Sequence, residues 1–271
     1  MAPNELVYET IQFSPYFGGD DPDLPGQIRA AARAGFAGIG IDHRGTLLHF
    51  TQKRGSLRDV AELLGENKLS CFAIQDLTVT EDERETLGLA ERCAEAAAVL
   101  RPSWVHCCFT APIRDETIQR FVRALELVRP ASRAGFSLEF LPWCEMNDVH
   151  TTREVIRRAA QPGVKLLVDT WHAQHGPSSW ADLESVALDE LAYVQFDDHP
   201  PLASQDLLRE TIDRRALPGD GEFDLTRFSG IFKAKGYAAP VSVEILNREM
   251  RAWPKDVFAQ RVYDAAIRYW M

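Results

Sequence analysis

The stretch Ala-Gly-Phe-Ser-Leu-Glu-Phe-Leu at residues 134–141 contains the pattern that decides the fold. A helix-like segment precedes it, and Gly135 supplies the backbone freedom with which helices commonly end. The short, mostly apolar run that follows is typical of a buried strand, although Glu139 interrupts it. The same transition occurs at Ala34-Gly35-Phe36. The stretch therefore predicts a helix followed by a buried strand that carries one carboxylate.

Similar units recur along the whole chain. Short β-branched or aromatic runs predict eight strands: Leu6–Phe13, Phe36–Asp42, Leu69–Gln75, Trp104–Phe109, Ser137–Leu141, Val164–Asp169, Leu191–Phe196 and Pro240–Leu246. Amphipathic stretches predict the helices Leu24–Ala34, Leu57–Leu64, Glu81–Leu100, Glu116–Arg133, Val149–Ala160, Ser179–Leu188, Leu225–Lys235 and Pro254–Trp270. Alternating strands and helices indicate a parallel sheet, and eight such units close into a (β/α)₈ barrel.

The length of 271 residues suits one domain, because (β/α)₈ barrels commonly occupy about 250 residues and no Pro/Gly/Ser-rich linker divides the chain. We expect a single α/β TIM-barrel domain over residues 1–271, with an extended βα loop at 198–222 near the active-site mouth. An open doubly wound sheet is the alternative. The residues after the first predicted strand lack the GxGxxG and GxxxxGKS/T turns that such sheets use for phosphates.

Charge and composition exclude several classes of function. The chain has 40 acidic and 30 basic residues, and its net charge of −10 opposes binding to nucleic acid or an anionic membrane surface. Neither an export signal nor an apolar run long enough to span a membrane is present. Five cysteines without a CxxC pair suit reduced thiols, so we expect a cytoplasmic location. The expected partner is a small carbohydrate-like molecule. The apolar segment Val257–Trp270 is compatible with a homo-oligomer, because some of its aromatic side chains could contact another subunit.

Strands five to eight each carry a polar residue where a barrel strand is normally apolar: Glu139, Asp169, Gln195 and Glu244. Active sites of such barrels gather at the carboxyl ends of the strands. Three carboxylates that converge there would repel one another unless a cation lay between them. Oxygen ligands favour a hard divalent ion, so we expect one Mn²⁺ or Mg²⁺ in preference to Co²⁺ or Zn²⁺.

At these residues the sequence resembles the sugar phosphate isomerase/epimerase proteins of the xylose-isomerase-like barrel superfamily. The segments that carry the resemblance are Leu138-Glu139-Phe140, Val168-Asp169-Thr170-Trp171-His172, Val194-Gln195-Phe196-Asp197 and Val243-Glu244-Ile245. The resemblance implies that Glu139, Asp169, Gln195 and Glu244 bind one divalent metal. Relatives include ketose 3-epimerases, hydroxypyruvate isomerase, inosose dehydratase and 3-dehydroshikimate dehydratases. The ketose 3-epimerases have a histidine where this chain has Gln195. At this position the chain is similar to hydroxypyruvate isomerase and some dehydroshikimate dehydratases.

The resemblance also implies several substrate contacts. His172 corresponds to a substrate-contacting histidine, and Arg215 resembles the arginine before a Pro-Gly-Glu-Gly turn. Arg214 is the adjacent alternative for that role. Glu145 matches a position at which a carboxylate orients a site residue, although a solvated loop glutamate is an equal alternative. Since few other basic residues lie near these motifs, the sequence favours a neutral or cyclic polyol over a phosphate ester as substrate.

Trp143 and Trp171 flank the same motifs and are expected to form apolar walls for the substrate, with core packing as the competing interpretation. We expect a divalent-metal-dependent isomerase or epimerase of a keto-sugar or related polyol. It would act through a metal-stabilised enediolate, with Glu139 and Glu244 moving the proton and His172 assisting. The alternative is a metal-dependent lyase or dehydratase of a cyclic keto-polyol or keto-glycoside, in which a β-hydroxyl leaves.

Two further classes fit less well. A DNA-repair nuclease of this superfamily would need more histidines than the single added cluster Asp197-Asp198-His199, and the negative net charge opposes it. A non-catalytic barrel that binds a partner would have no reason to keep four metal-ligand positions intact. Metal titration separates this last class from the enzymes.

Overall fold

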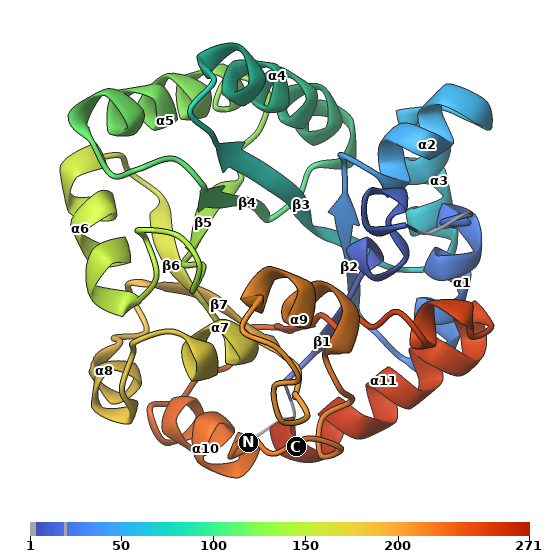
Figure 1. The fold of residues 1–271 in the computed structure, drawn as a ribbon. Helices are drawn as coiled ribbons and strands as arrows, with labels where there is room; N and C mark the ends of the chain where they lie inside the picture. The colour runs from blue at the N-terminus through green and yellow to red at the C-terminus, as the bar shows by residue number, and fades with distance from the viewer. Residues whose placement is uncertain (1–3, 19–20) are drawn as a thin grey trace.

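The computed structural model describes residues 4–18 and 21–271, which form a closed barrel of parallel strands (Figure 1). The strands are β1 (Leu6–Glu9), β2 (Gly38–Asp42), β3 (Ser70–Val79), β4 (Trp104–Phe109), β5 (Gly135–Glu139), β6 (Val164–Asp169), β7 (Leu191–Phe196) and β8 (Val241–Val243). Each pairs with its neighbour in chain order, and β8 pairs with β1. This confirms the predicted α/β barrel. The predicted domain 1–271 also includes residues 1–3 and 19–20, which lie outside the described residues.

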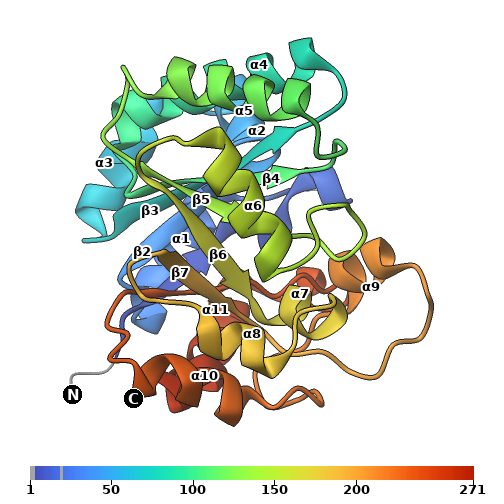
Figure 2. The same cartoon turned by 90° about the vertical axis from the view of Figure 1, so that its left-hand side faces the viewer.

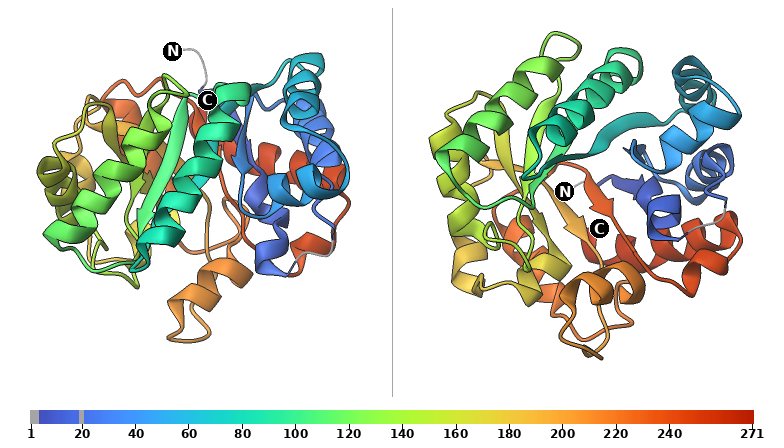
Figure 3. Two further views of the ribbon diagram at one scale, coloured as in Figure 1. Left: turned by 90° about the horizontal axis from the view of Figure 1, so that it is seen from above. Right: turned by 45° about the horizontal axis from the view of Figure 1, so that its top comes forward.

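Helices surround the barrel on its outer side (Figure 3). They are α1 (Leu24–Ala34), α2 (Thr46–Lys53), α3 (Leu57–Glu66), α4 (Glu83–Leu100), α5 (Asp115–Val128), α6 (Val149–Ala159), α7 (Thr170–His175), α8 (Trp180–Ser185), α9 (Leu207–Arg214), α10 (Leu225–Ala234) and α11 (Lys255–Trp270). The eight predicted helices do not include α2, α7 and α9, because helices of six to eight residues are too short for a 3.6-residue period to stand out. Within the described ranges, no helix is both long and apolar enough to cross a membrane.

The first and last strands are shorter than predicted because Gln12 takes over the pairing between them. Residues Thr10–Phe13 form a 3₁₀ turn, in which Nε2 of Gln12 donates to the carbonyl oxygen of Glu9 at 2.7 Å. Oε1 of the same Gln12 accepts a hydrogen bond from the backbone of Ile245 at 2.8 Å. This side chain therefore replaces a backbone ladder beyond β1 and β8, and it leaves Glu244 free to point into the mouth of the barrel.

The barrel interior is mostly apolar, but it holds the carboxyl group of Glu9. Its central layer consists of Val7, Phe72, Ala73, Leu167, Ala192 and Tyr193. Glu9 is completely buried near this layer, and a Cβ atom on Gly40 would lie 1.7 Å from its Oε2 atom. Gly40 is therefore the residue that makes room for a carboxyl group inside the barrel. Burial raises the pKa of Glu9 to about 8, so this group is neutral at pH 7.

The segment 198–222 carries α9, which projects from the barrel body (Figure 2). A two-way backbone bridge between Asp198 and Ala216 closes the base of this segment. The Asp198 carboxylate also accepts hydrogen bonds from the backbone amides of Gly219, Gly221 and Phe223 at 2.9–3.1 Å. The sequence at 198–222 thus forms a closed excursion from the barrel rather than a slack connection.

Candidate active site

A cavity of about 440 Å³ opens at the carboxyl ends of the strands. Glu139 ends β5, Asp169 ends β6, Gln195 lies one residue before the end of β7, and Glu244 follows β8. Glu139 and Glu244 line the cavity, and Asp169 and Gln195 are buried behind its wall. The barrel therefore brings the four predicted metal-ligand positions to one end, as the strand order requires.

Glu139 lies between two histidines. Nε2 of His106, on β4, is 3.1 Å from Oε2 of Glu139, and Nε2 of His172 is 3.6 Å from Oε1. Burial opposes a charge on His106, but the neighbouring Glu139 carboxylate prevails and raises the pKa of His106 to about 9. Burial also raises the pKa of Glu139. An imidazolium at His106 therefore compensates part of the negative charge that Glu139 brings into the barrel.

Asp169 links β6 to α7 and to the charged centre of the site. Its Oδ1 atom accepts the backbone amide of His172 at 2.9 Å, which caps the first turn of α7. Its Oδ2 atom lies 2.9 Å from Nη1 of Arg215. Although burial alone would raise the pKa of Asp169, the Arg215 guanidinium and His172 lower it. The cap fixes His172 next to the carboxylates.

Glu244 is held by two glutamines. Nε2 of Gln75 and Nε2 of Gln195 each donate to Oε2 of Glu244 at 3.0 Å. Within the described residues, the Oε1 atoms of both glutamines are buried without a hydrogen-bond partner. A buried amide oxygen without a donor is costly, and a cation would satisfy it.

Arg215 is the central cation of the site and is 1% exposed. Besides Asp169, its Nη1 atom contacts Oδ2 of Asp197 at 2.5 Å and lies 3.7 Å from Oε1 of Glu244. Its Nε atom donates to Thr211 at 3.0 Å, which ties the guanidinium to α9. Burial and the neighbouring Asp169 raise the pKa of Asp197. The carboxylates thus crowd around one guanidinium that does not fully compensate them.

The donor set fits a divalent metal ion. Ligand atoms of Glu139, Asp169 and His172 lie within 4.8 Å of one another. Four carboxylates, including Asp197 and Glu244, face the guanidinium of Arg215 and the imidazolium of His106. Burial and neighbouring carboxylates raise the pKa values of Glu139, Asp197 and Glu244, so these two cations do not compensate the cluster, and a divalent cation would do so. The partnerless Oε1 of Gln195 adds a neutral oxygen donor.

His172 is neutral in this setting. Burial lowers its pKa to about 4, and Arg215, whose Nη2 lies 3.5 Å from Nε2 of His172, adds to that effect. Its Nδ1 atom is buried without a partner in the described part of the chain. An imidazole in this position can accept a proton on Nε2 and pass it on, because it lies 3.6 Å from the Glu139 carboxylate and lines the cavity.

The other predicted substrate contacts separate into two groups. Trp143 and Arg215 line the cavity. Trp171 is 1% exposed and packs against His172 and His175, so it supports the site from behind instead of forming a wall. Glu145 is exposed outside the cavity, where its Oε2 accepts the backbone amide of Ile113 at 2.8 Å. Arg214 also points away from it and pairs with Glu210 at 2.5 Å.

Four polar residues at the site were missed by the sequence reasoning: Arg44, Gln75, His106 and Asp197. Gln75 and His106 lie within β3 and β4, where the rule applied to strands five to eight would have found them. Asp197 directly follows β7 and was considered only as part of a nuclease cluster. Arg44 follows β2 in a loop, and no periodicity places a loop residue at the mouth.

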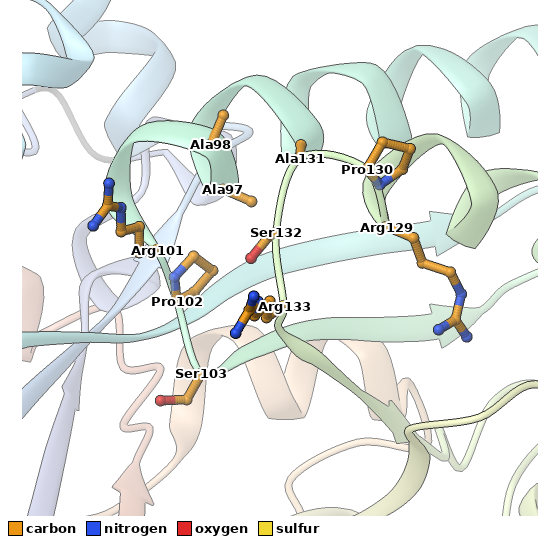
Figure 4. Close-up of a pocket in the computed structure, with 10 residues that line it drawn as sticks. All are labelled: Ala97, Ala98, Arg101, Pro102, Ser103, Arg129, Pro130, Ala131, Ser132 and Arg133. Carbon is orange, nitrogen blue, oxygen red and sulfur yellow. The ribbon is translucent and has the colours of Figure 1, made fainter.

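A second cavity of about 710 Å³ lies between the end of α4 and the segment before β5 (Figure 4). Its lining includes Arg101, Arg129 and Arg133, with no carboxylate. Ser103 and Arg133 precede β4 and β5, so this cavity lies at the amino ends of the strands, opposite the mouth. The guanidinium groups of Arg101 and Arg129 point away from each other, so they do not converge on a ligand. The candidate site is therefore the smaller cavity.

Comparison with known proteins finds sequence relatives that are enzymes and solved structures with the same fold. The chain is 32% identical to a 3-dehydroshikimate dehydratase of Pseudomonas aeruginosa over 245 residues, which is 85% of this chain and 37% of that protein. It is 29% identical to an inosose isomerase of Halalkalibacterium halodurans over 51% of this chain and 48% of that protein. The crystal structure of the IOLI protein with a bound zinc atom superposes with a TM-score of 0.84 at 18% identity, covering 98% of this chain and 97% of that one.

The chain thus spans little more than a third of the length of the dehydratase that it matches. The family model for the xylose isomerase-like TIM barrel matches residues 28–270, which include every strand from β2 to β8. With the closed barrel and the carboxylate cluster at its mouth, this match identifies the chain as a member of the xylose isomerase-like TIM barrel family.

Proposed function

We propose that this protein is a divalent-metal-dependent carbon–oxygen lyase that removes water from a cyclic β-hydroxy ketone. The observation that carries the proposal is the pairing of Glu139 with neutral His172, at 3.6 Å, beside a cluster of uncompensated carboxylates. The similarity to a dehydratase over 85% of the chain supports a lyase more than an isomerase, for which the similarity covers 51%.

Glu139, Asp169, Gln195 and Glu244 would hold the metal ion. When bound, such an ion withdraws electron density from a ketone oxygen and makes the adjacent C–H bond more acidic. The buried Oε1 atom of Gln195 and the raised pKa values of Glu139 and Glu244, which reflect burial and mutual repulsion, support these residues as ligands. His106, Gln75 and Arg215 would orient them, since each contacts at least one of these carboxylates.

The proton transfers can be followed on this chain's own groups. The Glu139 carboxylate accepts the α-proton, and the C–H electron pair becomes the new carbon–carbon double bond as the β C–O bond breaks. Nε2 of His172 accepts that proton from Glu139 and delivers it to the departing hydroxide, which leaves as water. Both residues return to their initial protonation states. The proton that leaves carbon therefore ends in the water molecule.

A second candidate is an isomerase or epimerase of a keto-polyol, which the inosose isomerase relative supports. In that reaction Glu139, at the end of β5, and Glu244, after β8, would remove and return a proton. The two candidates share the first step. They differ in whether a β-hydroxyl is lost afterwards, which changes the product mass.

The experiment uses the full chain, stripped of metal by chelation and then supplied with Mn²⁺ or Mg²⁺. The protein is incubated with 3-dehydroshikimate, an inosose and a panel of keto-sugars. A lyase yields a product that has lost one water and gains ultraviolet absorbance, whereas an isomerase leaves the mass unchanged. Glu154→Gln, on the exposed face of α6, is the matched control for Glu139→Gln. Turnover that does not respond to metal, or that survives in Glu139→Gln, would contradict the proposal.

A further inference from the structure

Arg44 brings a second cation to the active-site cavity, apart from the carboxylate cluster. It lies two residues beyond β2 and lines the cavity. Its Nη1 atom donates to Oγ1 of Thr78 at 3.0 Å and to Oδ2 of Asp76 at 3.3 Å. Its guanidinium carbon lies 4.8 Å from the centre of the Tyr16 ring. These contacts hold the planar group in one orientation.

One edge of this guanidinium is left for a ligand. The contacts of Nη2 are long, at 3.5 Å to the Tyr16 hydroxyl and 3.9 Å to Glu85. Nε makes no hydrogen bond to any residue that the structure describes. In a planar guanidinium, Nε and one Nη donate in parallel, which is the geometry that binds both oxygens of a carboxylate.

Arg215, the other arginine of the cavity, lacks this capacity. Its Nη1 atom is engaged by Asp169 and Asp197 and its Nε by Thr211, so only Nη2, whose contact to His172 is long at 3.5 Å, is left to donate. It is 1% exposed, whereas the Arg44 side chain is 18% exposed. A substrate carboxylate that enters the cavity can therefore bind Nε and Nη2 of Arg44 together, whereas Arg215 offers it Nη2 alone.

The spacing between Arg44 and the carboxylate cluster suits a cyclic substrate. Thr78, which binds Arg44, pairs in register with Cys108, and Cys108 pairs with Glu139. Two strand spacings separate Thr78 from Glu139, so their Cα atoms are about 10 Å apart. Trp143, Leu208 and Ile212 provide apolar cavity walls on which a ring can lie. A six-membered ring with a carboxylate at one end would reach from Arg44 to the carboxylate cluster.

We infer that Arg44 is a carboxylate subsite, and that the substrates are cyclic hydroxy keto acids rather than the neutral polyols that the sequence favours. Asp76 is its positioning residue, because it holds Nη1 without covering the donor edge. The inference rests on the proposed function for the reaction and adds the charge of the substrate.

Equilibrium binding to the metal-loaded full chain tests the subsite apart from turnover. The probes are 3,4-dihydroxybenzoate and its neutral isostere 3,4-dihydroxybenzamide, measured by titration calorimetry. The variants are Arg44→Gln and the double variant Arg44→Gln/Asp76→Asn, which leaves no buried charge unpaired. Arg123→Gln, an exposed arginine on α5 paired with Glu83, is the control for loss of one positive charge.

The wild type and Arg123→Gln should bind the acid at least tenfold more tightly than the amide. Both Arg44 variants should lose this preference, with amide binding unchanged within about twofold. Equal binding of acid and amide by the wild type, or an unchanged acid preference in the double variant, would overturn the inference. If the acid preference depends on Arg44 but no ketone is dehydrated, the subsite stands and the lyase proposal fails. If ketones are dehydrated but the acid preference does not depend on Arg44, the lyase proposal stands and the subsite inference fails.

Discussion

Nε2 of His172 and Oε1 of Glu139 lie 3.6 Å apart, although the two residues belong to different βα units. Asp169 sets this distance, because it caps α7 through the backbone amide of His172. The imidazole therefore has a fixed position relative to the carboxylate before any ligand enters. The proposed proton relay depends on this pair more than on any other contact in the cavity.

Replacing His172 by asparagine should lower kcat by about 10²- to 10⁴-fold, the range typical of a lost general acid–base group. Because His172 would not be a metal ligand in the lyase, metal affinity should change by less than about threefold. Steady-state kinetics and metal titration measure the two effects separately. A large loss of metal affinity would instead place His172 among the ligands, with Glu139 and Asp169.

Glu139→Gln and Glu244→Gln should each lose turnover by at least about 10³-fold, because either change removes a negative charge from the cluster that faces the cavity. The fold should persist, since each glutamine keeps the shape of the side chain. Circular dichroism and turnover at saturating metal test this pair. Glu154→Gln should match the wild type in both measurements.

Chelation should lower the melting temperature and abolish turnover, and added Mn²⁺ or Mg²⁺ should restore both. The physical reason is that the carboxylates at the mouth repel one another without a cation. Gln195→Leu should weaken metal binding by about tenfold or more, because it removes the neutral oxygen donor from the cluster. Differential scanning calorimetry across a metal titration provides the measurement. A melting temperature that does not change across the metal titration would contradict the proposed site.

Glu9 predicts a pH dependence of stability in the metal-free protein. Burial raises its pKa from 4.5 to about 8, so the folded state holds a proton that the unfolded state releases above pH 4.5. The folded state thus binds more protons between these values, and stability falls as the pH rises from about 4.5 to 8. Glu9→Gln should make this slope shallower and stabilise the protein at pH 8 by about 1–3 kcal/mol. Urea unfolding at pH 5 and pH 8 compares the two proteins.

Asp198→Asn should destabilise the protein by about 1–3 kcal/mol, because the carboxylate accepts amides from Gly219, Gly221 and Phe223 that an amide group satisfies only in part. The value of kcat/KM should fall as well, since Arg215 lies within the excursion that Asp198 closes. Urea unfolding and kinetics test both parts. Unchanged unfolding would show that Asp198 does not hold the turn.

The sequence predicts the barrel well because each strand and most helices satisfy their hydrophobic pattern locally. Helix α1 has the predicted bounds, and strands β4, β6 and β7 do as well. The four positions proposed as metal ligands could also be singled out from the sequence, because a polar residue within an apolar strand is visible without tertiary structure. Arg44 could not be predicted in this way. Its place in the cavity depends on Asp76 and Thr78 of the neighbouring strand, and such a contact leaves no periodic signal.

Trp171 and Glu145 show a different limit of sequence reasoning. Both lie near the metal-ligand motifs along the chain, but nearness along a loop does not fix the direction of a side chain. Trp171 turns inward against His175, and Glu145 turns outward to the backbone of Ile113. Arg214 and Arg215 are adjacent, yet only Arg215 enters the barrel mouth. Backbone direction at the end of α9 decides between them.

The bridge between Asp198 and Ala216 has a consequence for how this protein can acquire new substrates. Residues 199–214 leave and re-enter the barrel at one point, so their length and composition can change without moving any strand. The excursion nevertheless supplies Leu208 and Ile212 to the cavity and ends on Arg215. An exchange of this module between homologous barrels, with Asp198, Arg215 and Gly221 retained, would give a new specificity to an unchanged set of proton-transfer residues.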